Sequence, residues 1–144
     1  MFSNDSAVIK AVETGQCDLG IVNSYYLGRH LRENKEARNI LELFWLNQKE
    51  EGALKGVHVN VSGAGVLKSS KNSKNAIRLL EWLSGEEAQK IYASLNMEFP
   101  VVSGIELNDV VFQWGAFVQN KVHLSLTGKN QSRAIKVMDR SGYR

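Results

Sequence analysis

The sequence has very little cysteine or proline and no long apolar run. Its 144 residues include one cysteine, one proline and 12 glycines. A single cysteine excludes an internal disulfide framework and a cysteine-based zinc site. No run of 18 apolar residues occurs, so no transmembrane helix is expected. The first residues have no basic region followed by an apolar core, so no secretory signal is expected at this end.

Strong charge of one sign is also missing. The chain has 18 basic and 15 acidic residues, a formal net charge of +3, and basic residues that mostly occur singly. This pattern predicts no nucleic-acid partner. G-x-S-x-G, H-E-x-x-H and phosphate-binding glycine loops are absent, so no enzyme is expected. The 43% hydrophobic content is that of an ordinary globular chain.

Hydrophobic periodicity predicts an α/β fold. A first helix is expected to be capped at 4–6, to carry Ala7, Val8, Ala11 and Val12 at helical spacing, and to end at Gly15. The further helices expected are 25–33, 73–83, 85–95 and 130–140, the last with Ala134, Ile135 and Met138 inward. Strands are expected over 18–23, 40–46 and 56–62, and an extended segment over 99–102.

Two adjacent tyrosines, Tyr25 and Tyr26, follow the first predicted strand and begin a helix. Ligands of open α/β folds bind at the carboxyl ends of strands. At a strand-to-helix turn two neighbouring phenols can converge, whereas within a regular helix they diverge by about 100°. Because a phenol has a pKa near 10, two phenolates at neutral pH need a strong cation beside them, and a hard trivalent metal would serve. The alternative is that both rings simply pack the helix onto the sheet.

Several other polar residues have two interpretations. Asn23 and Ser24 could orient a bound anion or cap the helix, and we favour capping. His30, four residues after Tyr26, is an outer metal ligand or a surface histidine. His58 shares a strand face with Asn60 and Ser62, which could face a cleft or solvent. His123 has no candidate partner in the sequence. The remaining residues considered, Cys17, Trp45, Trp82 and Trp114, are expected in the core or an interface.

Residues 15–29, GQCDLGIVNSYYLGR, resemble the iron-ligand segment of the periplasmic ferric-iron-binding proteins of ABC transporters. The similarity continues in order through the rest of the chain, at 56–68 (GVHVNVSGAGVLK), 75–83, 85–89 (GEEAQ), 98–101 (EFPV), 128–130 and 138–143 (MDRSGY). In that family the tyrosine doublet supplies two phenolate ligands to Fe³⁺. The resemblance therefore implies that Tyr25 and Tyr26 are metal ligands.

The resemblance also implies an architecture and partners. The family has the two-lobed type II binding-protein fold, and this chain resembles its C-terminal half alone. Residues 1–55 and 107–144 are then expected in the second lobe, with 56–106 crossing to the first. The implied ligand is Fe³⁺, with a synergistic anion, and the implied partner is a membrane permease reached from the periplasm. The remaining iron ligands would lie in the other half.

Other functions stay open from the sequence. One is a type II binding protein for another small anion or an organic solute, with the tyrosines stacking or hydrogen bonding. Another is the effector-sensing domain of a transcription regulator, which has a similar two-lobed architecture. Fold likeness alone does not decide between them. Because neither lobe would have a complete sheet, exposed strand edges are expected to cause self-association of the chain.

Overall fold

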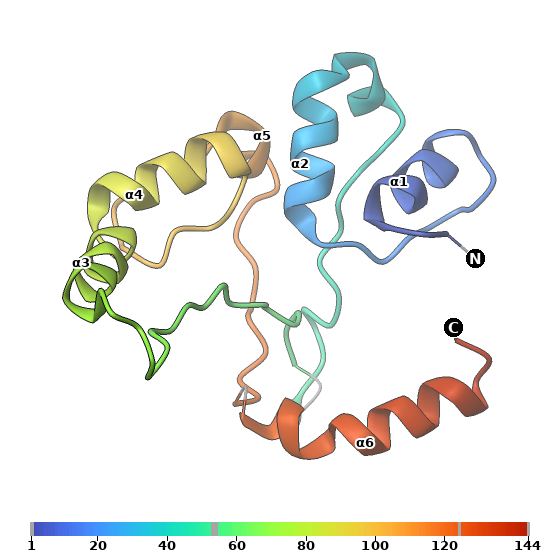
Figure 1. The fold of residues 1–144 in the computed structure, drawn as a ribbon. Coiled ribbons are helices and arrows are strands. Elements are labelled where there is room, and N and C mark those ends of the chain that lie inside the picture. Colours follow the sequence, from blue (N-terminus) through green and yellow to red (C-terminus); the bar gives the residue numbers. More distant parts are fainter. Residues whose placement is uncertain (1, 53–54, 124, 144) are drawn as a thin grey trace. The chain divides into compact units, whose positions relative to one another are not determined.

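The computed structural model describes residues 2–52, 55–123 and 125–143. These form two compact units, one from residues 2–44 and 61–115 and the other from the described residues of 45–60 and 116–143. The described elements are helical (Figure 1): α1 (Asp5–Glu13), α2 (Ser24–Glu33), the 3₁₀ helix η1 (Lys35–Asn39), α3 (Ser73–Leu83), α4 (Glu86–Ile91), the π-helical turn η3 (Tyr92–Asn96), α5 (Asp109–Phe112) and α6 (Ser125–Arg140). The predicted lobe boundaries at 55/56 and 106/107 stay predictions.

Helix α1 forms where the sequence predicts it. The Oδ1 atom of Asn4 accepts a hydrogen bond from the Ala7 backbone N–H at 2.9 Å, so one of the unpaired amides of the first turn is satisfied. Gly15 has φ 74°, a left-handed conformation that follows the end of the helix. The predicted cap and the predicted stop are both confirmed.

Replacing Asn4 with alanine is expected to destabilise the chain by about 1 kcal/mol, because the cap hydrogen bond is lost. Thermal denaturation followed by circular dichroism measures this change. Asn72→Ala is the matched control, since Asn72 precedes α3 in the same position but makes no side-chain cap hydrogen bond. Equal losses of stability in both variants would contradict the capping role.

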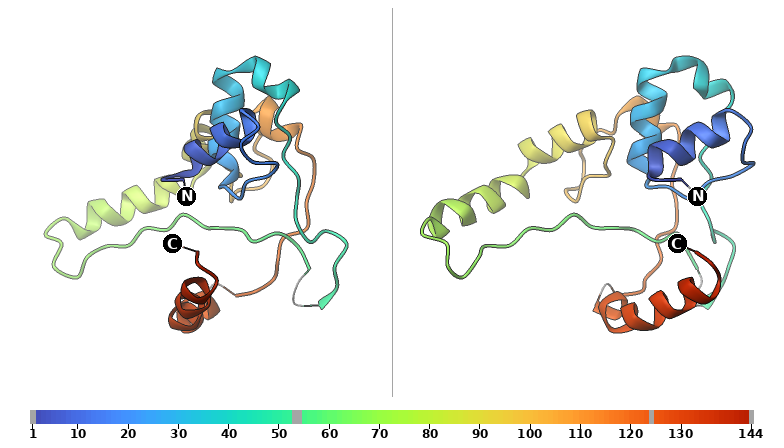
Figure 2. Two further views of the ribbon diagram at one scale, coloured as in Figure 1. Left: turned by 90° about the vertical axis from the view of Figure 1, so that its right-hand side faces the viewer. Right: turned by 45° about the vertical axis from the view of Figure 1, so that its right-hand side comes forward.

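Helix α2 packs its apolar face onto the core of the first unit. Leu27 and Leu31 are buried together with Ile9 of α1, and Tyr26 and Trp114 pack against this cluster. Helices α1 and α2 lie side by side in all three views (Figure 1, Figure 2). The full buried cluster is Ile9, Leu27, Leu31, Ala37, Leu41 and Val110.

The predicted strands are not confirmed. Residues 18–23, 40–46 and 56–62 form no strand in the described part of the chain, apart from one isolated parallel bridge between Val57 and Gln119. A strand exists only where a neighbour accepts and donates its backbone hydrogen bonds. Among the described residues only Val57 has such a neighbour, in residues 118–120, so the three apolar runs do not form a sheet.

The later helices differ from prediction in their ends and in their burial. The expected helix 85–95 is divided into α4 and the turn η3, and the expected helix 130–140 begins earlier, at Ser125. Ile135 and Met138 were expected inward but are 51% and 41% exposed, and no residue of α3 or α6 is buried. An amphipathic helix buries its apolar face only where another element covers it.

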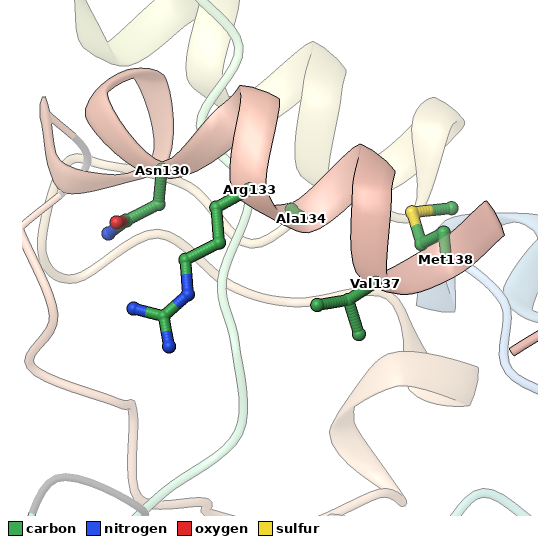
Figure 3. Close-up of a pocket in the computed structure, with 5 residues that line it drawn as sticks. All are labelled: Asn130, Arg133, Ala134, Val137 and Met138. Atoms are coloured by element: carbon green, nitrogen blue, oxygen red, sulfur yellow. The ribbon is translucent and has the colours of Figure 1, made fainter. Parts of the chain in front are cut away.

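Helix α6 carries a hollow of about 440 Å³ on its surface (Figure 3). All of the residues that line it belong to this one helix: Asn130, Arg133, Ala134, Val137 and Met138. The hollow therefore has no opposite wall within the described residues. Among the described helices, none combines the length and the apolar character needed to cross a membrane.

Candidate metal site

The two predicted ligands lie together at the start of α2. The ring centroids of Tyr25 and Tyr26 are 4.5 Å apart and the ring planes are tilted by 33°. The side chains of both residues are half-buried, and their hydroxyl groups are hydrogen-bonded to each other. Both residues lie inside α2, after its N-cap Asn23, so the predicted convergence is present although the backbone is already helical, where divergence was expected.

Arg29 is a part of the site that the sequence analysis did not identify. Its guanidinium carbon lies 5.0 Å from the centroid of the Tyr25 ring and 4.9 Å from that of Tyr26. A guanidinium this close to two aromatic faces makes a cation–π contact with each. The signal was present in the sequence, since Arg29 follows Tyr25 by four residues and Tyr26 by three, which is the spacing of neighbours on a helix surface.

The Tyr25 phenol keeps its proton more firmly than an isolated tyrosine. Its hydrogen bond with Tyr26 raises the pKa of Tyr25, and desolvation, the nearby Tyr26 and the Asp5 carboxylate raise it further, while Arg29 acts in the opposite direction. In the chain without a bound cation, Tyr25 is therefore a neutral phenol at physiological pH. A metal that binds here must displace the proton.

The chain before the doublet is held to α1. The Asn23 amide nitrogen donates a hydrogen bond to Asp5 Oδ2 at 3.0 Å. Asn23 precedes α2 but makes no side-chain cap hydrogen bond to it, so the favoured capping role is wrong for Asn23. Its side chain instead connects the turn to the first residue of α1, and this brings the Asp5 carboxylate close to the tyrosines.

The far side of α2 is held to residues 95–97. Arg32 Nη1 donates a hydrogen bond to the Leu95 carbonyl oxygen at 3.0 Å. Met97 is fully buried, and a Cβ atom placed on Gly28 would lie 2.8 Å from the Met97 Cβ. The absence of a side chain at residue 28 therefore allows Met97 to pack directly against the helix that carries the tyrosines.

The histidines have partners away from the tyrosines. His30 Nε2 lies 3.3 Å from Glu13 Oε2, at the end of α1. His58 is exposed, and its Nε2 lies 2.9 Å from Asn60 Oδ1, which agrees with the predicted shared face. His123 Nδ1 lies 2.9 Å from Ser125 Oγ.

Within residues 2–52, 55–123 and 125–143, no group of three His, Cys, Asp or Glu side chains could hold a metal. Cys17 is a half-buried free thiol. Two of the tryptophans pack against apolar groups as expected, Trp114 on the core cluster and Trp45 on Phe117 at 4.4 Å between ring centroids. Trp82 is 45% exposed and its Nε1 donates to Glu87, so it does not lie in the core of the described chain.

Comparison with known proteins identifies relatives of the whole chain. The chain is 38% identical to iron uptake protein A1 of Synechocystis over 98% of its own length and 39% of the relative's. It is 32% identical to the Fe(3+)-binding periplasmic protein of Serratia marcescens, over 74% of the chain and 31% of the relative. The chain is homologous to ferric-iron-binding proteins. No family model matches it.

The structural comparison agrees with the sequence comparison. A Trichodesmium protein, IdiA or FutA, solved in complex with iron and citrate ligands, superposes with a TM-score of 0.86 at 42% identity. The match covers 99% of this chain and 45% of that one. The structural neighbours are ferric-binding proteins with the type II binding-protein fold, and the relatives are transport proteins and not enzymes. The chain thus spans less than half the length of the relatives it matches.

Proposed function

We propose that this chain binds Fe³⁺ through the phenolate oxygens of Tyr25 and Tyr26, as part of a periplasmic iron-transport protein. The observation that supports this most is the convergence of two half-buried phenols beneath one guanidinium, at the N-terminus of α2. Anionic oxygen donors suit a hard trivalent ion. In the assembled protein, the ion would be held between lobes that close around it and would then pass to a membrane permease.

The surroundings of the two phenols fit the binding of a highly charged cation. The N-terminus of a helix and the Arg29 guanidinium both stabilise negative charge on the phenolates that form when the metal displaces their protons. The pair supplies only two oxygen ligands. Water, a small anion or residues outside this chain complete the coordination, so the chain alone is expected to bind Fe³⁺ weakly.

A ferric citrate titration followed by visible absorbance tests the proposal. Phenolate bound to Fe³⁺ gives a ligand-to-metal charge-transfer band, which neither free tyrosine nor ferric citrate gives. We expect a band that saturates at one iron per chain. Gallium citrate is the matched control, because Ga³⁺ is also a hard trivalent ion but gives no such band. No visible band at millimolar iron would contradict the proposal.

A second candidate function is the binding of a small organic anion by this site. The Arg29 Nε atom is buried and has no hydrogen-bond partner among the described residues. An orphaned guanidinium nitrogen favours an acceptor such as a carboxylate. Calorimetric titration with citrate, with and without iron, separates the two functions: binding that needs no iron would favour the anion.

The predicted α/β fold is proposed for the assembled protein, with residues 18–23, 40–46 and 56–62 as strands. Alone, the chain is expected to self-associate, because these segments are extended and have exposed apolar side chains such as Leu19 and Val61. Size-exclusion chromatography with light scattering measures this. A clean monomer at every chain concentration from about 1 µM to about 100 µM would contradict the expectation.

A further inference from the structure

Helix α1 lies beside α2 and is joined to it at both of its ends. At the start of α1, Asp5 Oδ2 accepts a hydrogen bond from the Asn23 amide nitrogen, just before α2 begins. At the end of α1, Glu13 Oε2 lies 3.3 Å from His30 Nε2, in the later part of α2. Between these pairs, Ile9 is buried in the core cluster to which α2 contributes. The two helices therefore run in the same direction, and the start of α1 lies beside the start of the helix that carries the tyrosines.

Asn23 is the residue from which α2 begins. Its backbone carbonyl oxygen accepts a hydrogen bond from the Tyr26 N–H at 3.1 Å, in the first turn of the helix. Its side chain makes no cap hydrogen bond to α2, and its amide nitrogen donates to Asp5. One residue thus has its backbone in the turn that carries the tyrosines and its side chain bound to another helix. A movement of Asn23 therefore moves the phenols.

Asp5 is well placed to hold this turn. It is the first residue of α1, whose first turn is capped by Asn4. Asp5 and Asn23 are both half-buried, and a hydrogen bond to a carboxylate is roughly twice as strong as one between neutral groups. The Asp5 carboxylate is also near the doublet, since it contributes to the raised pKa of Tyr25, after the larger effects of the Tyr26 hydrogen bond and of desolvation.

We propose that Asp5 is a positioning residue for the two tyrosines and that it acts through its hydrogen bond with Asn23. In this role Asp5 supplies a hydrogen-bond acceptor and no ligand to the metal. A pair of ligands whose turn is already fixed binds an ion more tightly than a pair whose turn must first be ordered. The inference rests on the proposed function of the doublet and adds to it a residue from a different helix.

Substitutions of Asp5 separate the hydrogen bond from the charge. Asp5→Ala removes the acceptor, and we expect it to weaken ferric binding about tenfold, the lower end of the loss caused by removing groups that support a ligand. Asp5→Asn removes the charge but keeps an acceptor oxygen for the Asn23 amide, so its affinity is expected to stay within about threefold of that of the unsubstituted chain. The ferric citrate titration measures both. Equal losses in the two variants would mean that the charge is the cause and would overturn the proposal.

A double-mutant cycle tests whether Asp5 acts through Asn23. Asn23→Ala is expected to weaken ferric binding at least as much as Asp5→Ala, and adding Asp5→Ala to it is expected to cause no further loss. Losses that simply add would overturn the proposal. Glu13→Ala is the matched control, because it removes the other acidic contact between α1 and α2, at His30, and is expected to leave ferric binding unchanged. An equal loss in this control would also overturn the proposal.

Amide hydrogen exchange tests the same hydrogen bond without iron. The Tyr26 amide is expected to exchange about tenfold faster in Asp5→Ala, whereas Asp5→Asn is expected to keep most of the protection. Unchanged exchange in Asp5→Ala would overturn the proposal. If the unsubstituted chain gives no ferric band, the proposed function fails, and the exchange measurement then decides whether Asp5 holds the turn. Urea denaturation of each variant shows whether a loss of ferric binding comes from unfolding.

Discussion

Replacing both Tyr25 and Tyr26 with phenylalanine is expected to weaken ferric binding by about 100-fold or more and to remove the visible band. Loss of groups that only support a ligand costs about 10–100-fold in metal affinity, so loss of two ligands costs at least as much. The change removes two oxygens and keeps both rings. The packing of Tyr26 on the core and the stacking below Arg29 are therefore retained.

The single variants and a matched control sharpen this result. Tyr25→Phe and Tyr26→Phe alone are each expected to weaken binding and to reduce the band intensity. Tyr92→Phe, Tyr143→Phe is the control, since these tyrosines lie far from the doublet in the sequence and outside α2. An unchanged band in the doublet variant, or an equal loss in the control, would contradict the assignment of Tyr25 and Tyr26.

Gly28→Val is expected to destabilise the first unit by about 3 kcal/mol, the upper end of the cost of overpacking. The new Cβ atom would lie 2.8 Å from the Met97 Cβ and 3.1 Å from the Trp114 ring. Neither neighbour can move away easily, because Met97 is fully buried and Trp114 packs on the core cluster. Helix α2 would have to shift, and the tyrosines would shift with it.

Urea denaturation followed by tryptophan fluorescence measures this loss. Gly128→Val is the control, because Gly128 lies in α6 and a Cβ atom there meets nothing within 4 Å. Valine has a slightly better helix propensity than glycine, so this variant is expected to be neutral or slightly stabilised. Similar losses at both positions would mean that the contact with Met97 is not the cause.

Helices α1 and α2 could be predicted from the sequence because their signals are local, whereas the short helices η1 and α5 were not predicted. Asn4 as a cap, Gly15 as a stop, and Leu27 and Leu31 on one face of α2 all act within a few residues. The strands could not be predicted in the same way. Residues 40–46 have the side-chain pattern of a strand, but pairing depends on a neighbour that the pattern does not contain. The predicted burial of Ile135 was wrong for the same reason, since nothing in the sequence says whether another element covers α6.

The candidate site likewise has parts that the sequence could predict and one part that it could not. The placement of Tyr25 and Tyr26 at a helix start follows from local signals. Arg29 could have been found from its helical spacing to both tyrosines. Asp5 could not, because it comes 20 residues earlier and reaches the site only through the packing of α1 beside α2 and its hydrogen bond with Asn23.

The Asn23–Asp5 hydrogen bond has a practical consequence for protein engineering. A shortened version of this polypeptide that starts after residue 5 keeps the whole tyrosine motif, yet it removes the acceptor that restrains the turn in front of it. Peptides cut to the motif alone would thus present two unrestrained phenols, and their iron affinity would underestimate that of the intact site. Minimal iron-chelating designs based on this segment need to retain the beginning of α1.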